Sequence, residues 1–407
     1  MTNDVYILGV GRTPFTRVGD LSLKSLTQQA VDACLRDAEL SVSDVEAVYF
    51  ANAGQGALGG QHMIRGQVAL RPLGFEALPI VNVENACASA STALRLAMTA
   101  VQAGEAEIVL AVGAERLAVG DSAASKAFFQ GALDVSGEDE GLADLLGAAA
   151  EGQGERSIFM DVYAGLAREH MRRFGTTQQH LAAVAAKNRR HAALNPHAQL
   201  REPLTMEEIL AARAVVWPLT LPMCAPIGNG AAAAVVGSAG ALKRLSARRA
   251  VRIAAAVVGS GRRQGVASQE PPITRRLANL AYERAGLGPR DVDLAEVHDA
   301  TAAGEILQTE YLGLVAEGRG GVSALAGETS LGGRIPVNLS GGLECNGHPI
   351  GATGLAQVHE VVTQLRGEAG PRQTPKARIG LVENGGGFIG GEEAVASVVV
   401  LEASPIR

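Results

Sequence analysis

Short runs of Val, Ile, Leu and Ala alternate along this chain with longer segments in which apolar residues recur at helical spacing. Residues 78–83, LPIVNV, have the length and composition of a short buried strand. Residues 91–104, STALRLAMTAVQAG, predict an Ala-rich helix that ends at Gly104. Because strands and helices alternate, the pattern predicts an α/β protein with mixed or parallel sheets whose faces are covered by helices.

The pattern repeats itself within the chain. Three pairs of segments match in the same order: 32–54 with 279–304, 78–98 with 334–358, and 106–115 with 377–386. Three matches in one order indicate a duplicated α/β unit. If the two copies pack about a pseudo-twofold axis, two strand-to-helix turns face a common cleft. The first turn holds Cys87, and the second comprises residues 345–349.

Domain organisation follows from the length of 407 residues and from the repeat. We predict an N-terminal half over residues 1–115 that continues at about 216–250, and a C-terminal half over residues 251–407. The remaining segment, 116–215, is predicted to be an inserted loop domain with helices of its own. An insertion of this size over the cleft is suited to cover a substrate.

Composition and charge argue against several classes of function. The net charge of −6 and the lack of a basic stretch interleaved with aromatic residues disfavour nucleic-acid binding. No run approaches the ~18 apolar residues of a membrane span, and no secretion signal is evident. The cysteines, at positions 34, 87, 224 and 345, lack metal-ligand spacing. We therefore expect a reduced cytoplasmic protein that binds no metal, membrane or nucleic acid.

Four segments carry candidate chemistry. Cys87 lies in VENACASAST, in a turn or first helical turn, where free N–H groups and the helix dipole favour a thiolate nucleophile. His348 in GHPIGATG is the candidate base, and His298 in EVHDAT ends a predicted strand. Two imidazoles beside one thiol can lower its pKa, take its proton and bind an oxyanion. In residues 383–391, ENGGGFIGG, the glycines let the backbone approach a ligand closely.

At these motifs the chain resembles the thiolase family, and within it the sterol-carrier-protein-type and archaeal-type thiolases, which are acetyl-CoA acetyltransferase-like. The matching motifs cover nearly the whole chain and are, in order, GVGRTPF, NVENACASAS, NGAAAAVV, EVHDA, GGLECNGHPIGATG and NGGG. The resemblance implies the duplicated αβαβα thiolase fold with an inserted loop domain. It also implies acyl-CoA and coenzyme A as substrates, no permanently bound cofactor, and a homodimer or a dimer of dimers.

The resemblance further implies roles for individual residues in ping-pong acyl transfer. Cys87 takes the acyl group, His348 activates it, and His298 joins His348 in binding the enolate oxygen. The backbone N–H groups of Cys87 and Gly385 hold the thioester oxygen. The positions implied to contact the pantetheine arm or the phosphates of coenzyme A are Ser260, Gly261, Arg168, Arg172, Arg173, Lys187, Arg189 and Arg190. A solvated helix face is the alternative interpretation for each of these six cations.

The chain departs from the family at the second cysteine of the reaction. Thiolases carry it two residues before the glycine triplet or directly after the His-Asp pair, where this chain has Glu383 and Ala300. A base for the α-proton, whose pKa is near ~20, is thus missing from both places. Cys345, three residues before His348, either replaces it or only packs, and Glu383 could serve if it faces the cleft. The two other cysteines, Cys34 and Cys224, are predicted to pack.

The predicted function is a thiolase-type acyl-CoA C-acyltransferase that makes or breaks a carbon–carbon bond through an acyl-Cys87 thioester. Two alternatives stay open. One is a C-acyltransferase or condensing enzyme that acts on an already acidic, non-CoA carbon nucleophile and needs no strong base. The other is a subunit that requires a small OB-fold or zinc-ribbon partner chain.

Overall fold

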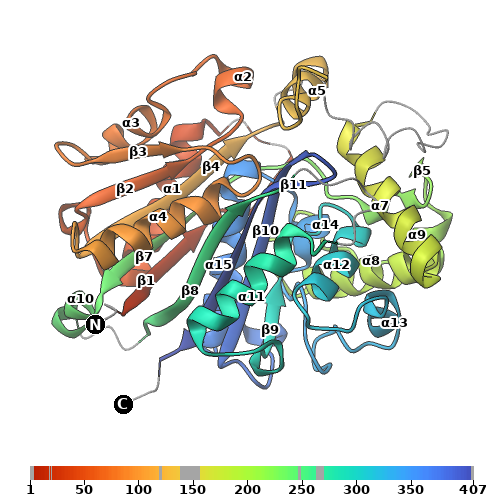
Figure 1. The fold of residues 1–407 in the computed structure, drawn as a ribbon. Coiled ribbons are helices and arrows are strands. Elements are labelled where there is room, and N and C mark those ends of the chain that lie inside the picture. The colour runs from red at the N-terminus through yellow and green to blue at the C-terminus, as the bar shows by residue number, and fades with distance from the viewer. Residues whose placement is uncertain are drawn as a thin grey trace.

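The computed structural model describes residues 4–17, 19, 21–118, 122–137, 156–245, 249–262 and 270–404. In these ranges nine strands form one sheet, in the order β3-β2-β4-β7-β1-β8-β11-β10-β9 (Figure 1). Its strands are β1 (Val5–Arg12), β2 (Ala47–Ala51), β3 (Ile80–Val83), β4 (Ile108–Arg116), β7 (Asn229–Ser238), β8 (Val251–Ser260), β9 (Leu294–Glu296), β10 (Ile379–Ile389) and β11 (Glu392–Ala403). A small separate sheet pairs β5 (Ala214–Val216) with β6 (Leu219–Thr220).

The large sheet repeats its pattern about the junction of β1 and β8. In the first half, β2 is parallel to β3 and β4, and β7 is antiparallel to β4 and β1. In the second half, β10 is parallel to β9, and β11 is antiparallel to β10 and β8. A parallel bridge between Ala295 and Val337 takes the place that β3 has in the first half. This mirrored order confirms the duplicated α/β unit.

Helices cover and separate the two halves of the sheet. The α-helices of the described ranges are α1 (Leu23–Ala38), α2 (Gln55–Gly59), α3 (Arg65–Leu70), α4 (Ser89–Ala103), α5 (Ser122–Gln130), α7 (Ile158–Phe174), α8 (Gln178–Ala193), α9 (Met206–Ala211), α10 (Ala239–Leu245), α11 (Ile273–Ala285), α12 (Ala302–Tyr311), α13 (Gly320–Leu325), α14 (Gly342–Asn346) and α15 (Thr353–Leu365). Helix α4 ends where the sequence predicted, because Gly104 adopts a left-handed φ of 75° and caps it.

Three buried clusters define the layers. The largest joins α4 and α15 to residues from both halves of the sheet, so these two helices form the middle layer. A second cluster packs α1 on the other face of the first half, and a third packs α11 on the other face of the second half. The order is therefore α/β/α/β/α, as predicted.

Small residues bring the two copies into close contact where their central helices begin. A Cβ atom on Gly354 in α15 would lie 2.1 Å from Ser91 Oγ in α4. A Cβ atom on Gly113 in β4 would lie 2.0 Å from the carbonyl oxygen of Gly351. Larger residues at these positions would separate the copies. The glycines therefore place the turn before α4 beside the loop before α15.

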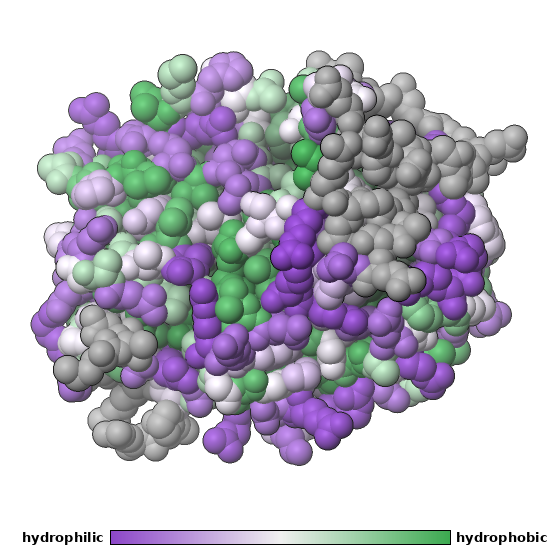
Figure 2. All heavy atoms as spheres, in the orientation of Figure 1, coloured by the Kyte–Doolittle hydropathy of each residue, from purple (hydrophilic) through white to green (hydrophobic). Residues whose placement is uncertain are grey.

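Helices α7, α8 and α9 lie at one end of the sheet and are coloured yellow to yellow-green in Figure 1. Helix α8 packs against α12, α13 and α14 of the second copy. On the face shown in Figure 2, hydrophobic residues gather over β8, in a groove between α4 and α11 that Met98, Ile253 and Ala255 help to line. In the described ranges, no helix combines the length and hydropathy needed to cross a membrane.

Candidate active site

Cys87 lies in the turn between β3 and α4, two residues before the helix begins. The turn is tied to the helix by Ser89, whose Oγ accepts a hydrogen bond from Asn85 N at 2.8 Å and donates one to Ala86 O at 2.6 Å. Ala86 has a φ of 46°, a conformation that is unfavourable for a residue with a Cβ. The sequence predicted this position for Cys87 but not the strained residue before it.

The glycine triplet in β10 lies directly against this turn. A Cβ atom on Gly386 would lie 2.6 Å from Asn85 O and 2.9 Å from Cys87 N, which is closer than side chains pack. The next residue, Gly387, has a φ of 63°, and its N–H group faces the sulfur of Cys87. The glycines are therefore needed for a close approach of β10 to the sulfur, as their sequence suggested.

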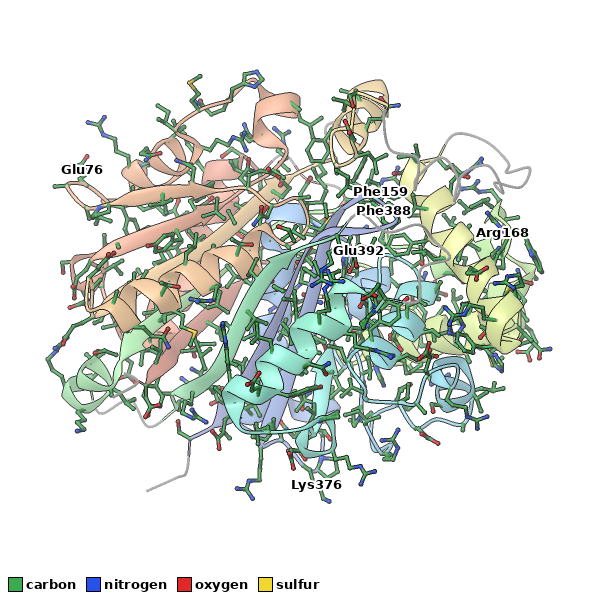
Figure 3. All side chains as sticks on the ribbon, viewed as in Figure 1. Glu76, Phe159, Arg168, Lys376, Phe388 and Glu392 are labelled. Atoms are coloured by element: carbon green, nitrogen blue, oxygen red, sulfur yellow. The ribbon has the colours of Figure 1, made fainter. Side chains whose placement is uncertain are left out.

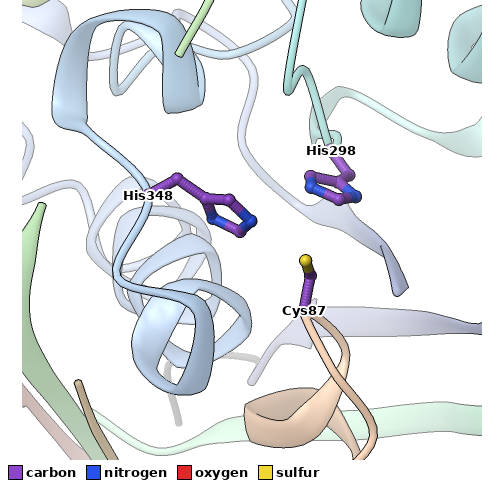
Figure 4. Close-up of side chains that lie close together, drawn as sticks. All are labelled: Cys87, His298 and His348. Carbon is purple, nitrogen blue, oxygen red and sulfur yellow. The ribbon is translucent and has the colours of Figure 1, made fainter. Parts of the chain in front are cut away.

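The structure brings together Cys87 from the first copy and His298 and His348 from the second (Figure 4). The sulfur and one nitrogen of each imidazole all lie within 4.8 Å of one another. The two rings have centroids 5.1 Å apart and are tilted by 48°. His298 follows β9 and His348 lies in the loop between α14 and α15.

Hydrogen bonds orient the ring of His348. Its Nδ1 lies 2.8 Å from Thr353 Oγ1, and that hydroxyl also lies 3.1 Å from Pro349 O, to which it donates. Because its proton is used there, the Thr353 hydroxyl accepts from Nδ1–H of His348. Nε2 of His348 then carries a lone pair, and it has no hydrogen-bond partner among the described residues. This nitrogen can accept a proton.

Burial keeps the three groups uncharged. It lowers the pKa of His298 to about 4, and it holds the pKa of His348 well below its ordinary value, with a further contribution from His298. It also raises the pKa of the Cys87 thiol to about 12, although the N–H group of Gly387 acts in the opposite direction. These directions run against the expectation of a preformed thiolate, because the effect of burial on the thiol pKa is larger than that of the neighbouring N–H groups. The resting site holds a thiol beside two neutral bases.

A cavity of about 250 Å³ opens onto these side chains. Phe159, Met160 and Tyr163 of α7 form an apolar part of its wall, and Gly385, Gly386 and Gly387 form another part. The wall also includes Ala300 and the predicted packing residue Cys224, whose Sγ donates to Thr220 O. Residues of the segment 116–215 thus line the cavity. Its largely apolar wall suits an acyl group.

Neither predicted substitute for the second cysteine lines this cavity. Cys345 is fully buried against Ala192 and Ala198, beside α8, so packing explains its place in the loop. Glu383 is also fully buried, and its Oε2 accepts a hydrogen bond from the backbone N–H of His298 at 2.9 Å. Glu383 therefore supports the backbone that carries His298.

The positions predicted to contact coenzyme A are scattered. Ser260 is exposed at the end of β8 and Gly261 packs against Glu393 O, but neither lines the cavity of Cys87. The prediction for Lys187 is wrong: its side chain is fully buried and its Nζ lies 2.7 Å from Glu305. Arg172 and Arg173 pair with Glu169 and Glu317, and Arg168 donates to Trp217 O.

Among the residues that line the cavity and that sequence reasoning missed, one is a carboxylic acid. Glu393, the second residue of β11, lines the cavity together with Cys87. The sequence offered a weak signal, a pair of acidic residues at the start of a long apolar strand, EEAVASVVVLEA. A charged residue in such a position ordinarily indicates a solvated strand end.

Family models match most of the chain. The model described as "Thiolase, N-terminal domain" matches residues 5–209, and the one described as "Thiolase C-terminal domain-like" matches residues 267–402. This chain belongs to the thiolase family. It is 36% identical over 96% of its length to acetyl-CoA acetyltransferase of Methanothermobacter thermautotrophicus, of which it covers 98%.

Two further comparisons agree with the resemblance seen in the sequence. The chain is 33% identical over 97% of its length to sterol carrier protein 2 of Bos taurus, and covers 72% of that protein. A solved structure titled "Ltp2-ChsH2(DUF35) aldolase" superposes with a TM-score of 0.79 at 27% identity, with 99% of each chain covered. The thiolase is thus an acyltransferase of its superfamily, and the predicted family and fold are confirmed.

Proposed function

We propose that this thiolase is an acyl-CoA C-acyltransferase that works by ping-pong transfer through an acyl thioester on Cys87. The observation that carries the proposal is the meeting of one thiol and two neutral imidazoles, from both copies of the fold, at an apolar cavity. A thiol beside a neutral base can be deprotonated as it attacks a thioester or ketone.

The first half of the reaction uses His348 as the base. As Cys87 Sγ attacks the substrate carbonyl, its proton passes to the free Nε2 of His348. A free thiolate, which burial disfavours, therefore does not have to form first. His298 and protonated His348 then donate hydrogen bonds to the oxygen that becomes negative. The backbone N–H groups of Cys87 and Gly385 are proposed to bind the oxygen of the acyl thioester.

The second half transfers the acyl group from Cys87. In the thiolysis direction, coenzyme A attacks the thioester, its thiol proton passes to His348, and His348 gives that proton to the Cys87 sulfur as it leaves. In the synthetic direction, the enolate of a second acyl-CoA attacks it and forms the carbon–carbon bond. Ser260, Gly261 and the arginines of α7 and α8 are the proposed contacts of coenzyme A, and both acyl-CoA and free coenzyme A are proposed substrates.

Mass spectrometry of the intact protein tests the proposal. After incubation with acetyl-CoA we expect one added acetyl group, mapped to Cys87 by peptide analysis, and none in Cys87→Ala. Failure of the wild-type protein to acquire an acyl group from acetyl-CoA or from longer acyl-CoA esters would contradict it.

A second candidate, a subunit that needs a partner chain, is favoured by one finding. The neighbour with 27% identity is titled as an aldolase that pairs Ltp2 with the chain ChsH2(DUF35). A partner requirement predicts that the purified chain becomes acylated but does not cleave carbon–carbon bonds until the partner is added. An aldolase or a scaffold would remain unmodified by acetyl-CoA.

The proposed homodimer is supported by the edge of the sheet. β3 is a terminal strand, and Val81 on it leaves 44% of its surface exposed. An exposed strand edge with an apolar side chain is suited to pair with a second copy. Light scattering should give the mass of a dimer or tetramer, and Val81→Lys should reduce it to that of a monomer.

A further inference from the structure

We propose that Glu393 is the acid/base that moves the α-proton in the carbon–carbon bond step, in place of the cysteine that this thiolase lacks. The inference rests on the acyltransferase function proposed above. Three observations carry it: the position of the carboxylate, the hydrogen bonds that hold it, and the lack of another suitable group in the cavity.

The carboxylate of Glu393 lies across β10 from the nucleophile. Glu393 pairs with Phe388 at the start of β11, and its side chain extends along β10 as far as Gly385. A Cβ atom on Gly385 would lie 2.3 Å from Glu393 Oε1, so only glycine leaves room for the carboxylate. The neighbouring Gly386 lies against the turn of Cys87 on the opposite face of the strand. The thiol and the carboxylate thus line one cavity from two sides of a glycine strand.

Two neutral donors hold the carboxylate in place. Gln308 Nε2 donates to Oε1 at 2.7 Å, and Thr274 Oγ1 donates to Oε2 at 3.2 Å. In the described part of the chain no ion pair forms to Glu393, whereas its neighbour Glu392 pairs with Arg276. Figure 3 shows Glu392 near Phe159 and Phe388, at the end of the sheet that faces α7. An oriented carboxylate without a cation is free to exchange a proton.

Burial raises the pKa of Glu393 to about 7, and the charge of Glu392 contributes to the rise. A carboxyl group with this pKa is present in both protonation states near neutral pH, which is what an acid/base group requires. Two uncharged residues of the cavity wall, Cys224 and Tyr163, could also exchange a proton in principle, but their pKa values are too high for an acid/base group near neutral pH. Burial raises the pKa of Cys224 to about 12 and that of Tyr163 well above its ordinary value, so both stay protonated. Among the described residues that line the cavity, Glu393 is the only carboxylic acid.

The proton balance is as follows in the cleavage direction. Cys87 sulfur bonds to the β-carbonyl carbon of a 3-oxoacyl-CoA as its proton passes to His348. The bond between the α- and β-carbons breaks, and its electron pair forms the enolate of an acyl-CoA. Protonated Glu393 gives its proton to the α-carbon and becomes a carboxylate, and His348 then returns its proton through solvent to that carboxylate, so both groups are reset before coenzyme A attacks. In synthesis this transfer runs from Glu393 to His348 after acetylation. The carboxylate then removes the α-proton, and the enolate attacks acyl-Cys87 while the thiolate leaves and regains its proton from His348.

Hydrogen–deuterium exchange at the α-carbon of acetyl-CoA in deuterium oxide separates this step from acylation. We expect Glu393→Gln to lower the exchange and the cleavage of acetoacetyl-CoA by about 10²–10⁴-fold. Acetylation of Cys87 should stay within about twofold of the wild-type rate, because it needs no α-proton. The matched control, Glu402→Gln, changes a carboxylate on the same strand that pairs with Arg252, and should leave both rates unchanged.

A second variant tests the role without removing the carboxylate. Thr274→Val takes one donor from the ionised form of Glu393, so the midpoint of the exchange rate against pH should move upward while the pH profile of acetylation stays unchanged. Wild-type exchange in Glu393→Gln, or an unmoved midpoint in Thr274→Val, would overturn the inference while the acyltransferase stands. Absence of acetylation in the wild-type protein would instead overturn the function on which it rests.

Discussion

The turn before α4 and the loop before α15 are copies of one structural element, yet they contribute different chemistry. In the first copy the cysteine, Cys87, reaches the cavity and a glycine strand lies against it. In the second copy the cysteine, Cys345, is fully buried beside α8, and His348, three residues later, faces the cavity instead. Equivalent backbone thus presents a thiol to the cavity once and an imidazole once.

The difference shows what duplication adds to a single α/β unit. At this site the thiol comes from one copy and both imidazoles come from the other. The glycines at the meeting point, Gly354 against Ser91 and Gly113 against Gly351, bring the copies close enough for that contact. The candidate site therefore depends on the interface between the copies.

The largest effect is expected from Cys87→Ala. Loss of the sulfur removes the acyl carrier, so acylation should vanish and cleavage of acetoacetyl-CoA should fall by about 10⁴-fold or more. Intact mass and a spectrophotometric thiolysis assay measure the two quantities. Substantial cleavage in this variant would mean that the first copy does not supply the nucleophile.

His348→Asn removes the base contributed by the second copy. We expect the rate of acylation to fall by about 10²–10⁴-fold, because the thiol with a pKa of about 12 then has to ionise unaided. Thr353→Val only frees the ring to rotate and should cost about tenfold or less. Stopped-flow measurement of acylation distinguishes the two variants, and an equal loss in both would contradict the role of Nε2.

Gly386→Ala tests the close approach of β10 to the Cys87 turn. The added Cβ would lie 2.6 Å from Asn85 O, so the turn must move at a cost of about 1–3 kcal/mol in unfolding free energy. Denaturant unfolding and the acylation rate should both show a loss. Gly288→Ala is the control, because its Cβ would meet nothing closer than 3.8 Å.

Stability should decrease as the pH rises from about 6.5 to 8.5. Burial raises the pKa of Glu115 in the first copy to about 7 and that of Glu344 in the second to about 8, both above the ordinary 4.5. A raised carboxyl pKa means that the unfolded chain releases these protons first, so increasing pH favours unfolding until the folded groups also ionise. Melting temperatures across this range measure the trend, and a flat or rising profile would contradict it.

The smallest effect on activity is expected from Cys345→Ala. Its side chain packs against Ala192 and Ala198, so truncation should lower the unfolding free energy by about 1 kcal/mol and leave acylation and cleavage within about twofold of wild type. A large loss of cleavage with acylation retained would instead indicate that Cys345 carries the α-proton. The cysteines of both copies would then take part in the reaction.

The elements with strong local patterns were predictable. The strand around Ile80–Val83 and the helix Ser89–Ala103 follow from β-branched and Ala-rich runs and from the left-handed cap at Gly104. The meeting of Cys87, His298 and His348 was predictable as well, because each lies in a motif at matching positions of the repeat. Side-chain direction was not predictable: Cys345 and Lys187 lie in promising segments but point into packed layers.

By itself, the sequence determined the duplicated α/β order, the place of the Cys87 thiol at a helix start and the two imidazoles that join it, since local periodicity and motif spacing carry that information. Only the tertiary structure decided which of the two turn cysteines, Cys87 or Cys345, reaches the cavity, that burial raises the pKa of the Cys87 thiol, and that Glu393 lines the same cavity. Those properties arise from burial and from contacts between residues far apart in the chain, where desolvation and the direction of each side chain depend on neighbours that no local pattern specifies.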